Sequence, residues 1–271
     1  MTELVSVVVT TCNRKGMLKR ALDSVINQSY QNLEIIVIDD GEALSAKDTC
    51  ENYNDSRIRY YNNEINLGAC ASRNRGISLA NGAYITGLDD DDSFTVNRIE
   101  SLSSQYDSRY SFVTSNTLEI KIKGDKKLFS RRREIGQKDM LWGNCVGTQI
   151  FTETFKLKEI GGFDESLSSA QDADVWLRML EKWGSALRTE ECMYHLYTDH
   201  EAPRISTSSR KVKGLKDFFS KHQNKMSFSQ RNFALLKISK YEGNLSKLRF
   251  LLSLVLMPSL LYLLKKSIKA I

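Results

Sequence analysis

Features that would place the chain among secreted, zinc-binding or linker-rich proteins are scarce. Its 271 residues include five cysteines, which are scattered, and no two of them form a C-x-x-C pair. This spacing favours reduced thiols in a cytosol over a disulfide framework or a zinc site. Only two prolines occur, and no Gly/Pro-rich or Ser-rich linker or internal repeat is found. We therefore expect one large globular domain, or one domain with an appendage.

The sequence shows neither a signal peptide at its N-terminal end nor a membrane-spanning helix at its C-terminal end. The N-terminal stretch MTELVSVVVTT has neither the basic region nor the cleavage site of a signal peptide, so we expect it to be the first strand of the fold. Near the C-terminus, the apolar run Phe250–Leu264 has 15 residues and contains Pro258. As a helix it would be about 22 Å long, which is too short for the ~30 Å hydrocarbon core of a bilayer.

Basic residues flank this apolar run and suit anionic headgroups: Lys247, Arg249, Lys265, Lys266 and Lys269. We predict that the segment 250–264 holds a cytoplasmic protein peripherally at the inner face of the cell membrane. The alternative is that it packs on the body of the chain or on a second copy, as in an oligomer.

Acidic residues are rare in the C-terminal part. Residues 204–271 contain 15 lysines and arginines but only 2 acidic residues, a net charge of +13, whereas residues 1–203 carry −7. The C-terminal part is therefore the candidate for anionic partners. It lacks interleaved aromatic residues for stacking on bases, so we expect no nucleic acid, although Phe218, Phe219 and Phe228 leave that alternative open.

Apolar and amphipathic segments alternate over the first ninety residues. Uniformly apolar, β-branched runs predict strands, and apolar residues spaced by three and four predict amphipathic helices. Asn13 is expected to cap the first helix. The alternation indicates an α/β fold with a mostly parallel central sheet, flanking helices and right-handed crossovers. The expected strands are 4–11, 32–40, 57–64 and 83–92, and the expected helices are 13–28 and 68–82.

Acidic residues gather where two of these strands end. Asp39 and Asp40 end one strand, and the four aspartates 89–92 end another. In an open parallel sheet the C-terminal strand ends share one edge, and ligands bind there. Adjacent carboxylates repel one another unless a cation lies between them. The two clusters therefore predict a site for Mg²⁺ or Mn²⁺ that also takes phosphate oxygens as ligands.

Five segments, in order, resemble motifs of the family 2 glycosyltransferases, which have the GT-A nucleotide-sugar fold. They are VSVVVTTCNR, NLEIIVIDDG, NLGACASRNRGI, YITGLDDDD and IGGFDESLSSAQDADVWLRM, and they extend over about residues 4–200. The resemblance implies a metal-dependent, inverting enzyme of the bacterial surface-polysaccharide type. It would move a hexosyl-type sugar from a nucleotide-sugar donor, with UDP-sugars favoured, to a hydroxyl of a lipid-linked or other oligosaccharide acceptor.

The resemblance also implies roles for single residues. Asp91 would bind Mn²⁺ or Mg²⁺, with His200 as a further metal contact. Asp172 would be the general base that deprotonates the acceptor hydroxyl. The nucleotide would contact Thr10, Asp39, Arg73, Asp89 and Asp90. The chain would then consist of a catalytic domain, 1–205, with a nucleotide-binding half (1–92) and an acceptor half (93–205), followed by a basic helical tail, 206–271.

Several of these residues have simpler interpretations. Arg73 could pair with a local carboxylate, and His200 could lie in a solvated loop. Asp172 could be a helix N-cap, and it follows Gln171 where the family motif has Glu-Asp. If that first carboxylate were essential, the chain would be a non-catalytic membrane-bound scaffold. A sugar-1-phosphate nucleotidyltransferase is a further alternative, but the segment TTCNRKGM lacks the Gly-rich, basic phosphate loop that it should show.

Overall fold

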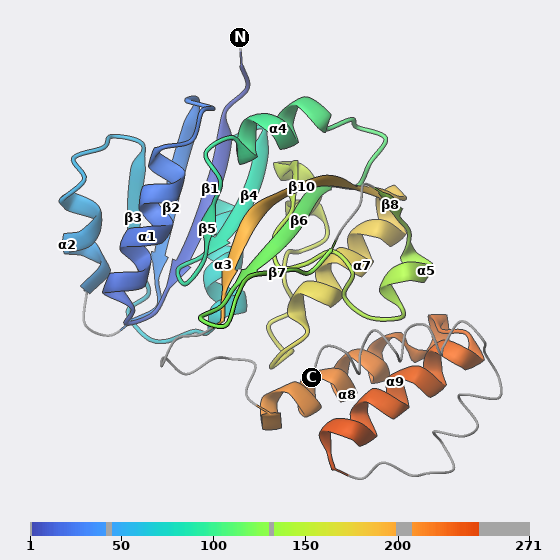
Figure 1. Ribbon diagram of the computed structural model, residues 1–271. Helices are drawn as coiled ribbons and strands as arrows, with labels where there is room; N and C mark the ends of the chain where they lie inside the picture. Colours follow the sequence, from blue (N-terminus) through green and yellow to red (C-terminus); the bar gives the residue numbers. More distant parts are fainter. Residues whose placement is uncertain (1, 42–44, 130–132, 199–207, 244–271) are drawn as a thin grey trace.

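The computed structural model of the protein describes residues 2–41, 45–129, 133–198 and 208–243 (Figure 1). The predicted metal contact His200, the predicted domain boundary at residue 205 and the apolar segment 250–264 lie outside these residues. Within the described residues, no helix is both long and apolar enough to span a bilayer.

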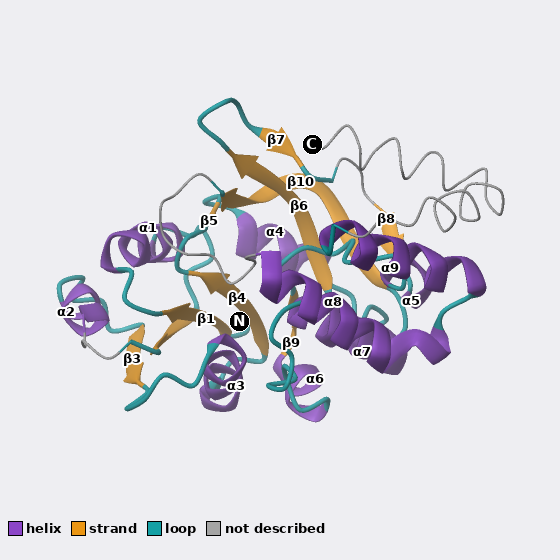
Figure 2. Ribbon diagram, turned by 90° about the horizontal axis from the view of Figure 1, so that it is seen from below, coloured by secondary structure: helices purple, strands orange, loops and turns teal. Residues whose placement is uncertain are grey.

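The first four strands along the chain are parallel neighbours in one large sheet, in the order β3-β2-β1-β4. Helices α1 and α3 cover opposite faces of these strands (Figure 2). The alternation predicted from the sequence is confirmed, with one addition, the short helix α2. The elements are β1 (Val5–Thr11), α1 (Lys15–Ile26), β2 (Leu33–Asp39), α2 (Ser45–Glu51), β3 (Ile58–Asn62), α3 (Ala69–Leu79) and β4 (Tyr84–Asp89).

Strand β1 is covered on both faces, and this explains why valine occupies four of its first five positions. Val8 packs with residues of α3, whereas Val7 and Val9 pack with Leu18 of α1. Gly76 allows α3 to approach β1 closely, because a Cβ at this position would lie only 3.2 Å from Val8 Cγ2. The close approach fixes α3, and with it Arg73, against the central strand.

The prediction that Asn13 caps α1 is wrong. The helix begins at Lys15, its N-cap is Arg14, and no side chain caps it. Asn13 instead adopts a left-handed backbone conformation (φ 56°), which asparagine tolerates better than most residues. Its side chain lies against Gly41, so that a Cβ on Gly41 would meet Asn13 Cγ at 3.1 Å. Asn13 therefore closes the turn after β1 against the loop after β2.

The second half of the sheet is mixed. Strand β9 is antiparallel to both β4 and β6, so β6 runs parallel to β4, and β10 is parallel to β6. The C-terminal ends of β6 and β10 therefore lie on the same edge as those of β1, β2 and β4. The elements are β5 (Ser93–Phe94), α4 (Arg98–Gln105), β6 (Val113–Ile120), β7 (Lys126–Lys127), β8 (Arg133–Ile135), α5 (Gln137–Met140), β9 (Phe151–Glu153), α6 (Thr154–Glu159), α7 (Gln171–Trp183) and β10 (Ala186–Tyr197).

Two further helices, α8 (Ser208–His222) and α9 (Phe228–Tyr241), pack beside α7 (Figures 1 and 2). A buried carboxylate fastens α8 to α7. Asp174 of α7 is fully buried and accepts hydrogen bonds of 2.8 Å from Arg178 Nε and His222 Nε2, and Lys221 Nζ also lies 2.8 Å away. Burial alone would raise the pKa of Asp174, but these cationic and hydrogen-bonding partners outweigh it and hold the pKa well below its usual range.

We expect Asp174→Ala to lower the free energy of unfolding by about 3 kcal/mol, because it leaves the buried His222 without its hydrogen-bond partner and two neighbouring cations without their counter-charge. Arg178 and Lys221 are partly exposed, which keeps the loss at the lower end for a buried pair. Since the folded-state pKa is depressed, this contribution is present above the unfolded pKa near 4 and is lost as pH falls through the lower folded-state value. Thermal unfolding at pH 7 and at pH 3 measures both effects.

Glu159→Gln is the matched control for this prediction, because it removes an exposed ion pair between α6 and Lys182 of the same helix α7. It should cost less than about 1 kcal/mol. Equal losses in the two variants would show that Asp174 does not fasten α8 to α7 in solution.

Candidate functional site

The strand register brings the predicted site residues together at the C-terminal edge of the sheet. Thr10 of β1 is opposite Asp89 of β4, and Thr11 is opposite Asp39 of β2. Three adjacent strands therefore end side by side, and each ends in a hydroxyl or carboxylate side chain. The prediction that the two acidic clusters share one edge is confirmed.

At the end of β2, the two aspartates differ in their surroundings. Both carboxylate oxygens of Asp40 are already hydrogen-bonded. They accept hydrogen bonds of 2.8 Å from the N–H groups of Leu67 and Gly68 and one of 2.7 Å from Asn63 Nδ2. It holds the loop between β3 and α3. Asp39 accepts one hydrogen bond at each oxygen, from Gly41 N–H (3.0 Å) and from the Tyr60 hydroxyl (2.9 Å).

The turn after β4, residues 89–92, alternates between buried and partly exposed carboxylates. Asp90 accepts a 2.7 Å hydrogen bond from Thr11 Oγ1, and burial raises its pKa to about 6. Asp92 accepts 2.6 Å and 3.0 Å bonds from the Tyr194 hydroxyl and the Tyr197 N–H, and burial raises its pKa as well. Asp90 and Asp92 therefore hold the turn in place, while the side chains of Asp89 and Asp91 reach the surface.

Arg14, just before α1, lies against this turn. Its Nη1 atom is 3.2 Å from Asp90 Oδ1 and 3.1 Å from Asp91 Oδ2. Arg20, one and a half turns further along, donates to the backbone carbonyl of Asp91 and packs its guanidinium 3.8 Å from the ring centre of Tyr197. A positive charge thus stands between two of the four carboxylates. Sequence reasoning assigned no role to either arginine.

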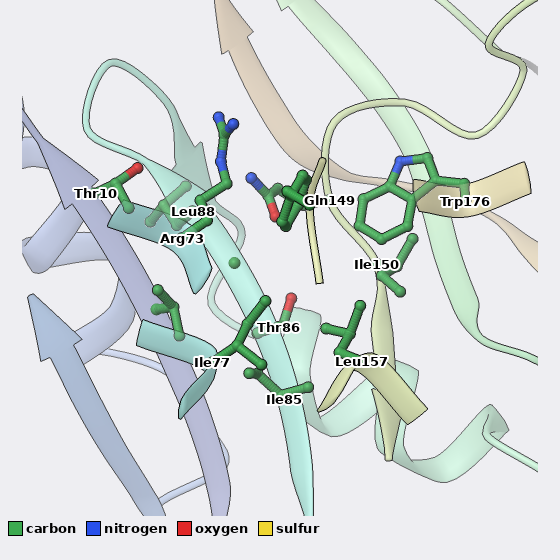
Figure 3. A pocket seen from close by; sticks show the side chains of 13 residues that line it. Thr10, Arg73, Ile77, Ile85, Thr86, Leu88, Gln149, Ile150, Leu157 and Trp176 are labelled. Atoms are coloured by element: carbon green, nitrogen blue, oxygen red, sulfur yellow. The ribbon is translucent and has the colours of Figure 1, made fainter. Parts of the chain in front are cut away.

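Arg73 of α3 connects the acidic turn to α7. Its Nη2 donates a 2.8 Å hydrogen bond to Asp89 Oδ1, and its Nη1 lies 3.5 Å from Gln171 Oε1 at the start of α7. Gln149 Nε2 donates to the same Asp89 oxygen at 3.3 Å. Figure 3 shows the Arg73 and Gln149 side chains next to each other. The local carboxylate that could pair with Arg73 is therefore Asp89.

Gln149 was not found by sequence reasoning. It comes from the loop before β9, 60 residues after Asp89, and no local pattern links the two. The available signal was Gly87 within β4, since a glycine inside a strand often marks a close approach by another group. A Cβ on Gly87 would indeed meet Gln149 Cδ at 2.9 Å.

A cavity of about 30 Å³ lies in the core behind Arg73 and Gln149 (Figure 3). It has room for about one water molecule and is far too small for a sugar nucleotide. Thr86 Oγ1 and Arg73 Nε are buried and have no hydrogen-bond partner among the described residues, and both residues line this cavity. The cavity therefore lies behind the candidate site and is not the place where the donor would bind. The donor would bind at the open edge of the sheet.

Asp172 is the second residue of α7, so the interpretation as a helix N-cap is wrong; the N-cap is Ala170, in a left-handed conformation (φ 60°). It accepts no hydrogen bond from any described residue. Burial raises the pKa of Asp172 to about 7, the Arg73 charge lowers it and the Asp89 charge raises it. A carboxyl group with a pKa near neutrality, beside an arginine that reaches the acidic turn, is suited to proton transfer.

No three acidic, histidine or cysteine side chains converge into a metal cage within the described part of the chain. The oxygen donors of Asp89 and Asp91 still fit Mg²⁺ or Mn²⁺, because such ions are commonly held by one or two carboxylates together with substrate phosphates and water. The guanidinium of Arg14 beside Asp91 shows that the turn accommodates a positive charge at that carboxylate. The geometry therefore fits a cation that shares its coordination with a diphosphate.

Residues 6–159 match the model of the family described as "Glycosyl transferase family 2". The chain belongs to this family. The resemblance to this family is confirmed, with four of the five sequence motifs inside the match to within one residue, and the protein is a glycosyltransferase with a mixed α/β fold of the GT-A type. The acidic turn and Arg73 lie within the matched residues, whereas Asp172 and α7 follow them.

Two relatives share the family at moderate identity. The "Putative colanic acid biosynthesis glycosyl transferase WcaA" of Escherichia coli is 33% identical over 93% of this chain and 93% of its own length. The "GalNAc(5)-diNAcBac-PP-undecaprenol beta-1,3-glucosyltransferase" of Campylobacter jejuni is 32% identical over 65% of this chain and 60% of its own length. The name of the first relative places that protein in colanic acid biosynthesis, which agrees with the predicted surface-polysaccharide type.

Solved structures with the same fold include TarS residues 1–349 from S. aureus in complex with UDP-GlcNAc, with a TM-score of 0.69, 16% identity, and coverage of 90% of this chain and 73% of that one. The mannosyltransferase PcManGT from Pyrobaculum calidifontis, in complex with GDP-Man and Mn²⁺, has a TM-score of 0.65 and 14% identity, and covers all of this chain and 81% of its own. At these identities the likeness establishes the GT-A fold alone.

Proposed function

We propose that the chain is an inverting, metal-dependent glycosyltransferase that moves a hexosyl-type sugar from a UDP-sugar to a hydroxyl of a lipid-linked saccharide in polysaccharide biosynthesis. The observation that carries the proposal is that Asp172 of α7, whose pKa is raised to about 7, lies within the electrostatic influence of Arg73 of α3, which donates a hydrogen bond to Asp89 of the acidic turn. One arginine therefore acts both on the proposed proton acceptor and on the turn proposed to hold the diphosphate.

In this mechanism Asp172 accepts the proton of the acceptor hydroxyl as its oxygen attacks the anomeric carbon. The bond to the diphosphate breaks with its electron pair, and the configuration inverts because attack and departure occur on opposite faces. Thr10, Asp39, Arg73, Asp89 and Asp90 would position the nucleotide and diphosphate, Asp90 through its support of the turn. A divalent cation at Asp91 would neutralise the charge that develops on the departing diphosphate.

The choice of donor, metal and acceptor rests on analogy. UDP-GlcNAc is the ligand of the TarS structure, and Mn²⁺ accompanies GDP-Man in the archaeal mannosyltransferase. The name of the Campylobacter enzyme specifies an undecaprenol-linked acceptor. Because such acceptors lie in a membrane, we also propose that the basic C-terminal segment keeps this cytoplasmic enzyme at the inner membrane face.

Calorimetric titration with UDP, GDP and dTDP, each with and without Mn²⁺, tests the proposal. We expect one nucleotide, UDP, to bind in the presence of Mn²⁺ and to bind at least tenfold more weakly in its absence. Titration of Mn²⁺ alone is the control, and it should give little heat because the described residues offer no complete cage. If no nucleotide binds under any condition, the transferase mechanism is wrong for this chain, and a scaffold is the better interpretation.

A further inference from the structure

The ribbon of residues 118–128, hereafter the lysine hairpin, extends the sheet beyond its other strands. Strand β7 pairs with β6 alone among the described strands, through Leu118 with Lys127 and Glu119 with Lys126. Gly124 closes the turn with a positive φ of 112° and donates its N–H to the Lys121 carbonyl at 3.0 Å. In Figure 2 the hairpin projects away from the rest of the molecule.

The surface of the lysine hairpin combines one apolar tip with a net positive charge, because its four lysines outnumber its two acidic residues, Glu119 and Asp125. Ile122 is 90% exposed, more than any other large hydrophobic residue among those described. The hairpin carries four lysines: Lys121 and Lys123 flank Ile122 in sequence, and Lys126 and Lys127 form β7. Lys121 pairs with Glu119 at 2.9 Å, and the other three form no ion pair with a described residue.

The base of the hairpin adjoins the candidate site. Ile120, the last residue of β6, is paired with Tyr197 of β10, and the N–H of Tyr197 donates to Asp92 of the acidic turn. The ring of Tyr197 also packs on Arg20, which contacts the carbonyl of Asp91. Whatever binds the hairpin therefore lies on the sheet edge where the donor is proposed to bind.

We propose that the lysine hairpin is an interaction surface for the anionic face of a membrane. Its lysines contact lipid phosphates, and Ile122 enters the boundary between headgroups and acyl chains. Lysines on an edge strand also prevent strand-to-strand aggregation, which accounts for Lys126 and Lys127 but not for an exposed isoleucine at the tip. An exposed apolar residue on a hairpin with a net positive charge has the chemistry of interfacial binding to anionic lipid.

One apolar side chain and three lysines that form no ion pair within the described part of the chain give a weak, reversible contact, so the hairpin orients the enzyme and does not anchor it. The contact would place the acidic turn close to the plane in which a lipid-linked acceptor lies. In this respect the inference rests on the proposed function, but the contact itself does not require transfer to occur. A test that measures the membrane contact alone can therefore fail without contradicting the proposed transferase function, and the reverse also holds.

Ile122→Trp in the full chain, mixed with vesicles of phosphatidylcholine and phosphatidylglycerol with brominated acyl chains, measures the contact directly. We expect tryptophan emission beyond that of the wild type to shift to the blue and to be quenched at least twofold by the bromine. Val96→Trp is the matched control. Val96 is a 61% exposed aliphatic residue whose carbonyl accepts the Ser29 N–H beyond the end of α1, toward the opposite edge of the sheet. The emission of the tryptophan at position 96 should be neither shifted nor quenched by the brominated vesicles.

A second comparison tests the lysines. The triple variant Lys123→Gln, Lys126→Gln, Lys127→Gln should partition onto the same vesicles roughly tenfold more weakly. Lys15→Gln, Lys47→Gln, Lys138→Gln removes the same charge from exposed positions elsewhere and should have a small effect.

Three results would overturn the proposal. They are an unquenched tryptophan at position 122 on vesicles to which the chain is bound, no binding to anionic vesicles at all, and equal losses in the two lysine triples. Quenching that appears only when the vesicles carry a lipid-linked saccharide would assign the hairpin to the acceptor, which also contradicts a contact with the membrane itself. Nucleotide binding measured on the same variants shows that the folded site is intact.

Discussion

Asp91→Asn is expected to lower kcat/KM by roughly 10³-fold and to abolish the Mn²⁺-dependent part of nucleotide binding. Asp91 is one of the two partly exposed carboxylates of the acidic turn, and Arg14 is its cationic partner. The other partly exposed one, Asp89, is already held by Arg73 and Gln149. The metal contributes several kcal/mol of charge stabilisation in such sites, and 1.36 kcal/mol corresponds to a factor of ten in rate. Calorimetric titration of nucleotide with and without Mn²⁺, and steady-state kinetics, measure the two losses.

The control for this variant is Asp48→Asn in α2. Asp48 is a carboxylate with 72% of its side chain exposed, outside the acidic turn. The Asp48→Asn variant should bind nucleotide and turn over as the wild type does. If Asp91→Asn keeps its Mn²⁺ dependence, the ion is held by other groups, and Asp89 becomes the candidate.

Asp172→Asn should reduce kcat by 10²- to 10⁴-fold, the usual contribution of a general base, and should change the KM for donor only slightly. The wild type should lose kcat/KM about tenfold per pH unit below pH 7, because only the deprotonated form of Asp172 accepts a proton and its pKa is raised to about 7. In the Asp172→Asn variant, kcat/KM should not fall in this way below pH 7. Initial rates from pH 5 to pH 9 on both proteins measure it.

Asp164→Asn provides the comparison for Asp172. Asp164 lies in the loop before α7, is partly exposed, and pairs with Lys221 and Ser166. Its replacement should leave both kcat and the pH profile nearly unchanged. Unchanged turnover in Asp172→Asn would remove this residue as the base, and a wild type without any turnover would support the scaffold interpretation.

The first half of the fold was predictable because its signals are local. Strand β1 carries valines toward both of its faces because both are covered, and α1 shows the spacing of an amphipathic helix, so the order of elements follows from the sequence. Once strands and helices alternate, the parallel sheet places Asp39 and Asp89 on one edge without further information. The residues predicted for the site were therefore those at the ends of recognisable strands.

The supports of the site were not predictable, because they join residues that are distant in the chain. Gln149 reaches Asp89 across 60 residues, and Tyr194 reaches Asp92 across 102. Neither glutamine nor tyrosine carries a pattern that points to a carboxylate elsewhere. Asn13 was misassigned because asparagine suits a helix cap and a left-handed turn equally well. The four aspartates looked alike in sequence, and only their partners distinguish the two that hold the turn from the two that reach the surface.

The attachment of α8 to α7 has a consequence for what counts as the minimal enzyme. The family match ends at residue 159, before Asp172 and before both of the helices that pack beside α7. The buried carboxylate Asp174 lies two positions from the proposed base, and it joins that position to His222, near the far end of α8. A fragment ending with the match would keep the proposed donor edge but lose the proposed proton acceptor, and one ending before α8 would leave Asp174 buried in α7 without its partner His222. We therefore expect the smallest fragment with transferase activity to extend at least through His222.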